Sequence, residues 1–310
     1  MLQLKLQYIE ENKWFHQWYN RFCLDKLNKN RNLYTDSTTE ISNEKPLFIT
    51  GFFRSGTSVT AKLLNIMGMD LGPEKHLLKA KNKRAQLNPD GFFENYLFME
   101  TSLMLFTKLN SWGHLPPTES ALNNFEFSAT DKQTFAEFTL CGVHDDRISN
   151  KNKMAVLKNY DLFSLNTYLQ KEFKFPYAIK NPHFSVMTEF LLKKWPQATL
   201  LVCFREPMAA IASAAKITSM LNQEIYLKYY EQLVKLPDNK VAFFSFDHLL
   251  KNPQKSLNAL CNNFNLATQK IKIAESIIKP ALHRYKNAGE ITNEKVKEIY
   301  HLMINKAINK

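Results

Sequence analysis

The segment Leu47–Ser58 has the sequence LFITGFFRSGTS and indicates the fold class of this 310-residue chain. Its first four residues form a short apolar run between a proline and a glycine, which is typical of a buried β-strand. Beyond the loop Gly51–Ser58, apolar side chains recur on one helical face from Val59 to Met67. The segment therefore predicts a strand, a loop and a helix in direct succession.

The loop keeps the G-x-x-x-x-G frame of a phosphate-binding loop (P-loop), with Gly51 and Gly56 as its two glycines. In such a loop, backbone N–H groups and the N-terminus of the following helix form a cradle for an anion. A nucleotide-hydrolysing P-loop has lysine after the second glycine, whereas this chain has Thr57 there and its cation, Arg54, inside the loop. The hydroxyls of Thr57 and Ser58 can add donors. The alternative is an ordinary strand-turn-helix in which Thr or Ser caps the helix, and the loop alone favours neither interpretation.

Three further apolar strands, each followed by a helix, are predicted downstream. The strands are Tyr177–Lys180, Thr199–Phe204 and Val241–Phe246. The helices are expected near Ser185–Trp195, at Pro207–Met220, and from the last strand to about Phe264 with a break at Asn252-Pro253. Strands that alternate with helices favour an α/β fold, a P-loop-type parallel sheet flanked by helices on both faces.

We expect residues 1–310 to form a single domain, because this length suits one α/β fold with a long insertion. Residues 1–45 are predicted to be a helical N-terminal extension, and residues 68–176 a mostly helical insertion. Hydrophobic residues make up 45% of the chain, which suffices for a sizeable core and argues against disorder over most of its length.

The chain is basic, with 41 lysines and arginines against 29 acidic residues and a formal net charge of +12. Such a charge attracts polyanions, including nucleic acids and phosphorylated cofactors. The lysines are scattered, however, and no block of five or six basic residues marks a nucleic-acid-binding arm. We therefore expect no nucleic-acid partner and regard the charge as compatible with a polyanionic nucleotide.

The four cysteines, Cys23, Cys141, Cys203 and Cys261, are too dispersed to indicate a zinc site or a disulfide framework. Polar and acidic residues follow the N-terminus too closely for a secretory signal. No apolar stretch approaches the ~18–20 residues of a transmembrane segment. We expect a cytoplasmic protein without a transmembrane segment; its oligomeric state cannot be inferred from the sequence.

A second candidate anion-binding element follows the third strand. Arg205 stands at the carboxyl end of that strand, which is the edge where open α/β sheets bind ligands. Ser213 follows eight residues later, about two helical turns on. A surface ion pair for Arg205 and a neutral helical serine are the alternatives. If both elements bind anions, the ligand carries two separate phosphate-like groups.

Five segments, in the order of the chain, resemble the sulfotransferase superfamily, and in particular its bacterial-type members. They are FITGFFRSGTS (48–58), NPDGFFEN (88–95), YAIKNPHF (177–184), LLVCFREPMAAIAS (200–213) and SFDHLLKNPQKSLNALCNNFNL (245–266). The resemblance implies a metal-free enzyme that transfers a sulfuryl group from 3′-phosphoadenosine 5′-phosphosulfate (PAPS) to a hydroxyl or amine. The acceptor would be a small molecule, glycan or lipid, bound on the side of the 68–176 insertion.

The resemblance also implies roles for individual residues. The 5′-phosphosulfate would be bound by Arg54, Ser55, Gly56, Thr57 and Ser58. The 3′-phosphate would be bound by Arg205 and Ser213, and Lys180 would lie near the transferred group.

Two residues are candidates for the base that deprotonates the acceptor. Glu94 occupies the glutamate position of the NPDGFFEN segment, and its aromatic neighbours predict burial that raises its pKa. His183 follows the second strand. Asn181 and His183 replace the aspartate and arginine of the family's K-D-P-R segment. We favour Glu94 because its surrounding motif is more complete.

Other functions remain as alternatives at this stage. In a P-loop kinase, Asp247 after the last strand would bind magnesium, although the characteristic lysine of its P-loop is missing here. The altered segment around Lys180 also permits a sulfotransferase fold that binds nucleotide without catalysis. A nucleic-acid-binding protein is disfavoured because no helix-turn-helix, zinc or RNP pattern is present.

Overall fold

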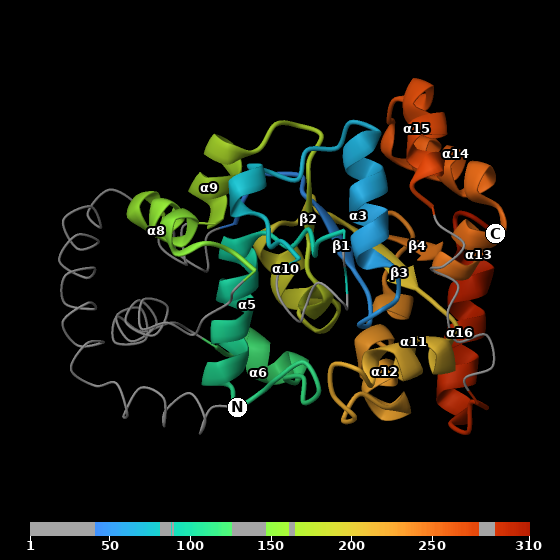
Figure 1. The fold of residues 1–310 in the computed structure, drawn as a ribbon. Helices are drawn as coiled ribbons and strands as arrows, with labels where there is room; N and C mark the ends of the chain where they lie inside the picture. The colour runs from blue at the N-terminus through green and yellow to red at the C-terminus, as the bar shows by residue number, and fades with distance from the viewer. Residues whose placement is uncertain (1–40, 81–87, 89, 126–146, 161–164, 279–288) are drawn as a thin grey trace.

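The computed structural model describes residues 41–80, 88, 90–125, 147–160, 165–278 and 289–310 (Figure 1). Within these residues, the strands are β1 (Leu47–Thr50), β2 (Ala178–Lys180), β3 (Thr199–Phe204) and β4 (Val241–Ser245). They form one sheet of order β2-β1-β3-β4, and all neighbouring pairs are parallel. The predicted parallel sheet is confirmed.

The helices and 3₁₀ turns (η) carry the labels of Figure 1. Those before β2 are α3 (Thr57–Ile66), η2 (Glu74–His76), α5 (Tyr96–Lys108), α6 (Glu119–Asn123), α8 (Asn150–Asn159) and α9 (Leu165–Glu172). Those between β2 and β4 are η3 (Pro182–Val186), α10 (Thr188–Lys194), α11 (Pro207–Ala214), α12 (Gln223–Tyr230) and η4 (Leu233–Lys235). Those after β4 are α13 (Phe246–Lys251), α14 (Pro253–Phe264), η5 (Thr268–Lys270), α15 (Ile271–Ser276) and α16 (Glu294–Lys306).

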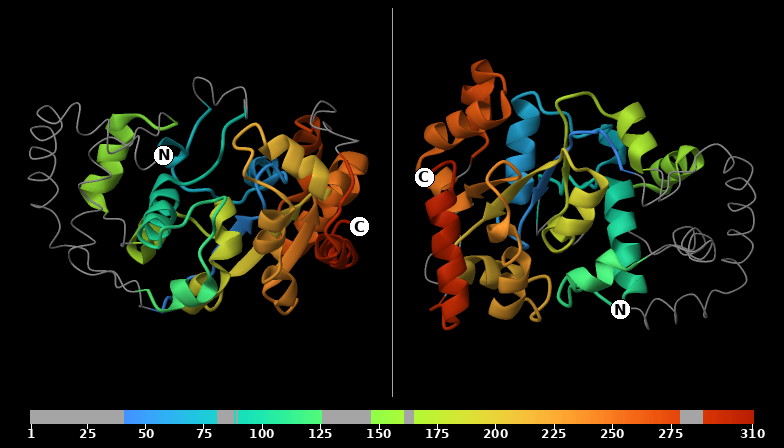
Figure 2. Two further views of the ribbon diagram at one scale, coloured as in Figure 1. Left: turned by 90° about the horizontal axis from the view of Figure 1, so that it is seen from below. Right: turned by 180° about the vertical axis from the view of Figure 1, so that it is seen from behind.

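Alternate strand residues enter two separate hydrophobic cores because successive side chains point to opposite faces of a sheet. Phe48 and Leu200 belong to one core, which α5, α9, α10, α12 and α16 complete. Ile49 and Leu201 belong to the other, which α3, α13, α14 and α15 complete. Figure 1 shows α3 in front of the sheet, and the rear view in Figure 2 shows α10 in front of the opposite face. Helices therefore cover both faces, as predicted.

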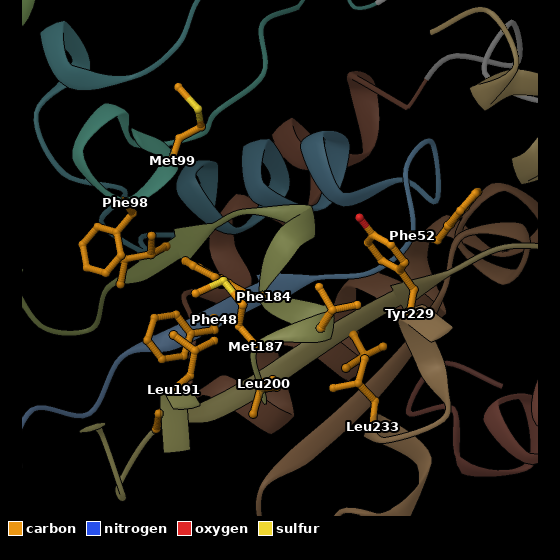
Figure 3. Packing of buried hydrophobic residues seen from close by; sticks show 14 of the residues in the cluster. Phe48, Phe52, Phe98, Met99, Phe184, Met187, Leu191, Leu200, Tyr229 and Leu233 are labelled. Atoms are coloured by element: carbon orange, nitrogen blue, oxygen red, sulfur yellow. The ribbon is translucent and has the colours of Figure 1, made fainter. Parts of the chain in front are cut away.

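Aromatic rings pack together with leucine and methionine side chains in the first core (Figure 3). Phe48 of the central strand lies beside Ile179 of β2 and Leu200 of β3. Its ring meets that of Phe184 edge to face, with centroids 4.9 Å apart. This packing, together with a hydrogen bond of 2.9 Å between the hydroxyls of Thr50 and Ser185, holds η3 against β1.

Two predicted helices differ from the observed ones. The helix expected at Pro207–Met220 ends at Ala214. The Thr218 hydroxyl accepts a hydrogen bond from the Met220 N–H, a local turn that competes with helix continuation. The helix expected near Ser185–Trp195 is divided into η3 and α10 by Met187. By contrast, the predicted break before Pro253 separates α13 from α14.

The predicted N-terminal extension lies almost wholly in residues 1–40, outside the described residues. Within 68–176, the described segments contain the helices α5, α6, α8 and α9. Because the strands are parallel, their carboxyl ends meet at one edge of the sheet. The loop 51–56, Asn181, Arg205 and Phe246 therefore all begin at this edge, where α/β proteins bind ligands.

Candidate functional site

The loop between β1 and α3 has the geometry of an anion-binding turn. Gly51, Arg54 and Gly56 have positive φ angles of 141°, 65° and 89°. The first N–H groups of any helix lack intrahelical partners. In α3 the preceding residue, Gly56, provides no side-chain cap for them. These donors and the positive end of the helix dipole are suited to binding an anion.

Two serines of this loop are already engaged within the protein. The Ser55 N–H donates to the Phe52 carbonyl at 3.2 Å, and its hydroxyl lies 3.1 Å from the Tyr230 hydroxyl. The Ser58 hydroxyl donates to the Phe92 carbonyl at 3.3 Å. Ser55 therefore stabilises the turn itself, and Ser58 ties the start of α3 to the segment that contains Glu94.

The second anion-binding candidate contacts the first. Arg54 Nε donates to Ser213 Oγ at 3.2 Å, which joins two residues 159 positions apart in the sequence. Arg205 is buried, with its Nε 3.8 Å from Asp247 Oδ1 and its guanidinium 5.3 Å from the Phe246 ring centroid. The structure thus brings the candidate residues from the two βα turns into one site.

A buried charge cluster lies at the carboxyl end of β2. Lys180 Nζ donates to Glu94 Oε1 at 2.6 Å, and Arg147 Nη1 donates to Glu94 Oε2 at 2.9 Å. A single parallel bridge also pairs the backbones of Glu94 and Lys180. Two of the predicted catalytic residues, Glu94 and Lys180, therefore touch each other, and each carboxylate oxygen has a cationic partner.

The match to known families identifies the chain. A family model described as "Sulfotransferase family" matches residues 46–270, more than half of the chain. The chain belongs to the sulfotransferase family. The matched range includes every site residue predicted from the sequence, from Arg54 to Ser213.

Several solved sulfotransferase structures are similar to this family member. The sulfotransferase domain from the olefin synthase of Synechococcus PCC 7002 has 14% identity and a TM-score of 0.49, covering 86% of this chain and 95% of that one. The sulfotransferase domain from the curacin biosynthetic pathway has 15% identity and a TM-score of 0.47, covering 85% and 99%. Sulfotransferase STF9 from Mycobacterium avium has 16% identity and a TM-score of 0.40, covering 85% and 77%. A search of the curated proteins finds no match.

The described part of this sulfotransferase was compared with the requirements for a membrane-spanning helix and for a metal site. None of its helices there combines the length and apolarity that crossing a membrane requires. Among the same residues, no group of three or more His, Cys, Asp and Glu side chains is arranged to hold a metal ion.

The expected rise in the pKa of Glu94 is wrong in direction. Burial does raise the pKa of this carboxyl, but the nearby positive charges of Lys180 and Arg147 outweigh burial and lower it below its ordinary value. The sequence indicated the burial correctly, whereas the two cations come from distant segments. Glu94 is consequently ionised in this sulfotransferase at neutral pH.

His183 is neutral and lacks one hydrogen-bond partner. Burial lowers the pKa of its imidazole to about 4. The ring lies between Phe106 and Phe53, with centroids 4.8 Å and 5.9 Å away. Its Nδ1 has no hydrogen-bond partner among the described residues. Asn181 holds the backbone here, because its Oδ1 accepts from the His183 N–H at 3.0 Å.

We expect His183 to make the protein less stable under mildly acidic conditions. An unfolded histidine takes up its proton near pH 6.5, whereas native His183 does so only near pH 4. Between these values the unfolded state binds more protons, so the free energy of unfolding decreases as the pH falls. From pH 7 to pH 5 this effect amounts to roughly 2 kcal/mol. Urea denaturation at both pH values measures it.

The control for this prediction is a second histidine. His183→Gln should lose this part of the pH dependence, whereas His301→Gln, at an exposed position of α16, should keep it. The range stays above the ordinary pKa of 4.5 for Glu94, so that carboxyl contributes little. If His183→Gln kept the full pH dependence of the free energy of unfolding, the lowered pKa of His183 would not be its source.

Sequence reasoning missed Arg147 and three tyrosines of α12, which contact the candidate site. Arg147 is separated from Glu94 by 53 residues and carries no motif. The tyrosines did leave a signal, because Tyr226, Tyr229 and Tyr230 have the spacing of one helical face.

Proposed function

We propose that this family member transfers a sulfuryl group from PAPS to a hydroxyl or amine acceptor. The hydrogen bond between Arg54 and Ser213 carries the proposal. It joins the loop suited to a 5′-phosphosulfate to the element suited to a 3′-phosphate, and PAPS carries both groups on one ribose. A ligand with a single phosphate would leave one of the two elements without a partner.

The residues present fit this nucleotide. The positive φ angles of the loop and the uncapped start of α3 suit the 5′-phosphosulfate, with Arg54, Gly56, Thr57 and Ser58 as its ligands. Ser55 would act chiefly by holding the turn. At the 3′ side, Arg205 and Ser213 supply a guanidinium and a hydroxyl.

In the proposed reaction, PAPS supplies an activated sulfuryl group whose bond to the phosphate oxygen breaks as the acceptor attacks. Oxygens that gain negative charge in this step require fixed positive partners, and Arg54 and Lys180 suit that role. Alignment of acceptor and donor supplies much of the remaining rate enhancement. The chemistry therefore depends on positioning and charge.

The proton from the acceptor has two candidate destinations. Glu94 is ionised and can accept it, although Lys180 and Arg147 each already donate to one of its oxygens and lower its basicity. His183 is neutral, and its Nδ1 is unpaired among the described residues. A general base must come within hydrogen-bonding reach of the proton that it removes. Both residues therefore stay candidates.

Ligand-dependent thermal stability tests the proposed donor. A ligand at ~100 times its dissociation constant should stabilise the protein by about 2.7 kcal/mol. We expect 3′-phosphoadenosine 5′-phosphate to raise the melting temperature by about 4 °C, because unfolding 310 residues has an entropy of roughly 0.65 kcal/mol/K. Arg205→Ala should abolish the shift, whereas Lys297→Ala, at an exposed ion pair on α16, should retain it.

The same experiment distinguishes the alternatives. A shift with ATP and magnesium but not with the bisphosphate would favour the P-loop kinase. Against the kinase, Asp247 accepts from the Glu206 N–H at 2.7 Å and pairs with Arg205, which supports its role as an acidic turn residue. Bisphosphate binding without PAPS consumption, in the presence of small-molecule, glycan and lipid acceptors, would favour a nucleotide-binding protein without catalysis.

A further inference from the structure

Helix α12 directs three tyrosine hydroxyls at three different segments of the site. Tyr226, Tyr229 and Tyr230 are all fully buried and share one helical face. Burial raises the pKa of each phenol, so each hydroxyl keeps its proton and can donate one hydrogen bond. Figure 1 shows α12 beneath the lower end of α3, on the side where the phosphate-binding loop lies.

Tyr230 fixes the loop that precedes α3. Its hydroxyl donates to the Cys203 carbonyl at 2.9 Å and accepts from the Phe52 N–H at 2.9 Å. Ser55 Oγ lies 3.1 Å away. The Tyr230 hydroxyl is the donor in this contact too, so its single proton is shared between the Cys203 carbonyl and Ser55 Oγ. Tyr230 thus connects the loop to the end of β3 through three hydrogen bonds.

Tyr226 makes a similar hydrogen bond to the backbone of the second candidate anion-binding element, which follows β3. Its hydroxyl donates to the Arg205 carbonyl at 2.9 Å and so holds the backbone of the residue proposed to bind the 3′-phosphate. Tyr226 and Tyr230 pack against each other, with ring centroids 4.7 Å apart. The hydrogen bonds of Tyr226 and Tyr230 are therefore both made by side chains that pack together on α12.

Tyr229 contacts neither anion-binding element through its hydroxyl. It donates to the Gly113 carbonyl at 3.0 Å. Tyr229→Phe removes one hydroxyl from the same helix and the same depth of burial. It is therefore a matched control for the other two tyrosines.

We propose that α12 sets the spacing of the two phosphate-binding elements, with Tyr230 as the positioning residue for the 5′ loop and Tyr226 for the 3′ element. The inference rests on the proposed function, because it takes these elements to bind the two phosphates. Neither phenol needs to touch the nucleotide. Each acts by holding backbone that does.

A binding experiment with three nucleotides distinguishes the role of Tyr230 from that of Tyr226. Calorimetry with 3′-phosphoadenosine 5′-phosphate, 5′-AMP and 3′-AMP measures the contribution of each phosphate to affinity. Tyr230→Phe should weaken binding of the bisphosphate and of 5′-AMP by about tenfold and leave 3′-AMP unchanged. Tyr226→Phe should weaken the bisphosphate and 3′-AMP and leave 5′-AMP unchanged. Tyr229→Phe should change none of the three.

The pattern distinguishes positioning from general destabilisation. A merely structural loss would lower the melting temperature of all three variants without altering the preference between 5′-AMP and 3′-AMP. The inference would be overturned if Tyr230→Phe and Tyr226→Phe each weakened binding of 5′-AMP and 3′-AMP equally, or weakened neither. Binding of the bisphosphate to the unaltered protein would still uphold the proposed donor. If the unaltered protein binds none of the nucleotides, the proposed function fails, and this inference fails with it.

Discussion

Replacing Gly51 with alanine is expected to destabilise the protein by more than about 4 kcal/mol or to prevent folding. A Cβ at this position would lie 2.0 Å from the Cys203 carbonyl oxygen and 3.0 Å from its carbonyl carbon. Those atoms belong to β3, which is paired with β1 on one side and β4 on the other. The backbone therefore cannot move aside without disrupting the sheet. Urea denaturation, or the yield of folded protein, measures the effect.

Gly68→Ala separates this clash from backbone strain. Gly68 also has a positive φ, 110° against 141° at Gly51, but a Cβ there would meet no atom within 4 Å. Its replacement should cost only the ~1–2 kcal/mol of a left-handed conformation. Equal losses in the two variants would show that the approach to Cys203 is not what requires glycine at Gly51.

The strands, and the succession of strand, loop and helix around Gly51–Gly56, could be predicted because their signals are local. Thr199–Phe204 consists of a threonine followed by five apolar residues, and the observed strand has the same bounds. The loop from Gly51 to Gly56 has its own pattern of glycines, and the residues on either side form the expected strand and helix. Such features depend on the period of side chains and on turn chemistry, which a sequence displays directly.

The electrostatics of the site could not be predicted because they arise between distant segments. Lys180 and Arg147 are 86 and 53 residues from Glu94 along the chain. Aromatic neighbours in the sequence indicate burial and hence a raised pKa, but these two cations reverse the direction. Likewise, nothing near Arg54 in the sequence indicates its contact with Ser213. A motif can identify candidate residues, whereas their protonation states follow from the packing of the whole chain.

Replacing Lys180 with methionine is expected to destabilise the protein by about 3–5 kcal/mol, the typical cost of removing one partner from a buried ion pair. Lys180 is 3% exposed and Glu94 is 7% exposed, so water cannot replace the lost ammonium. Methionine fills a similar volume, which keeps the cavity small. In this variant Glu94 retains Arg147 alone, and burial then opposes its ionisation more strongly. Chemical denaturation at neutral pH measures the loss without requiring an acceptor.

The double variant Glu94→Leu/Lys180→Met determines whether the loss belongs to the pair. Glu94→Leu alone leaves two buried or half-buried cations facing an apolar side chain and should also be destabilising. Removing both charges eliminates the mismatch between Lys180 and the apolar side chain and leaves only Arg147 without this carboxylate, and replacing a buried ion pair with apolar residues is often close to neutral. We therefore expect the double variant to be more stable than the sum of the single losses predicts, by at least about 2 kcal/mol. Strict additivity would mean that Lys180 and Glu94 do not stabilise each other.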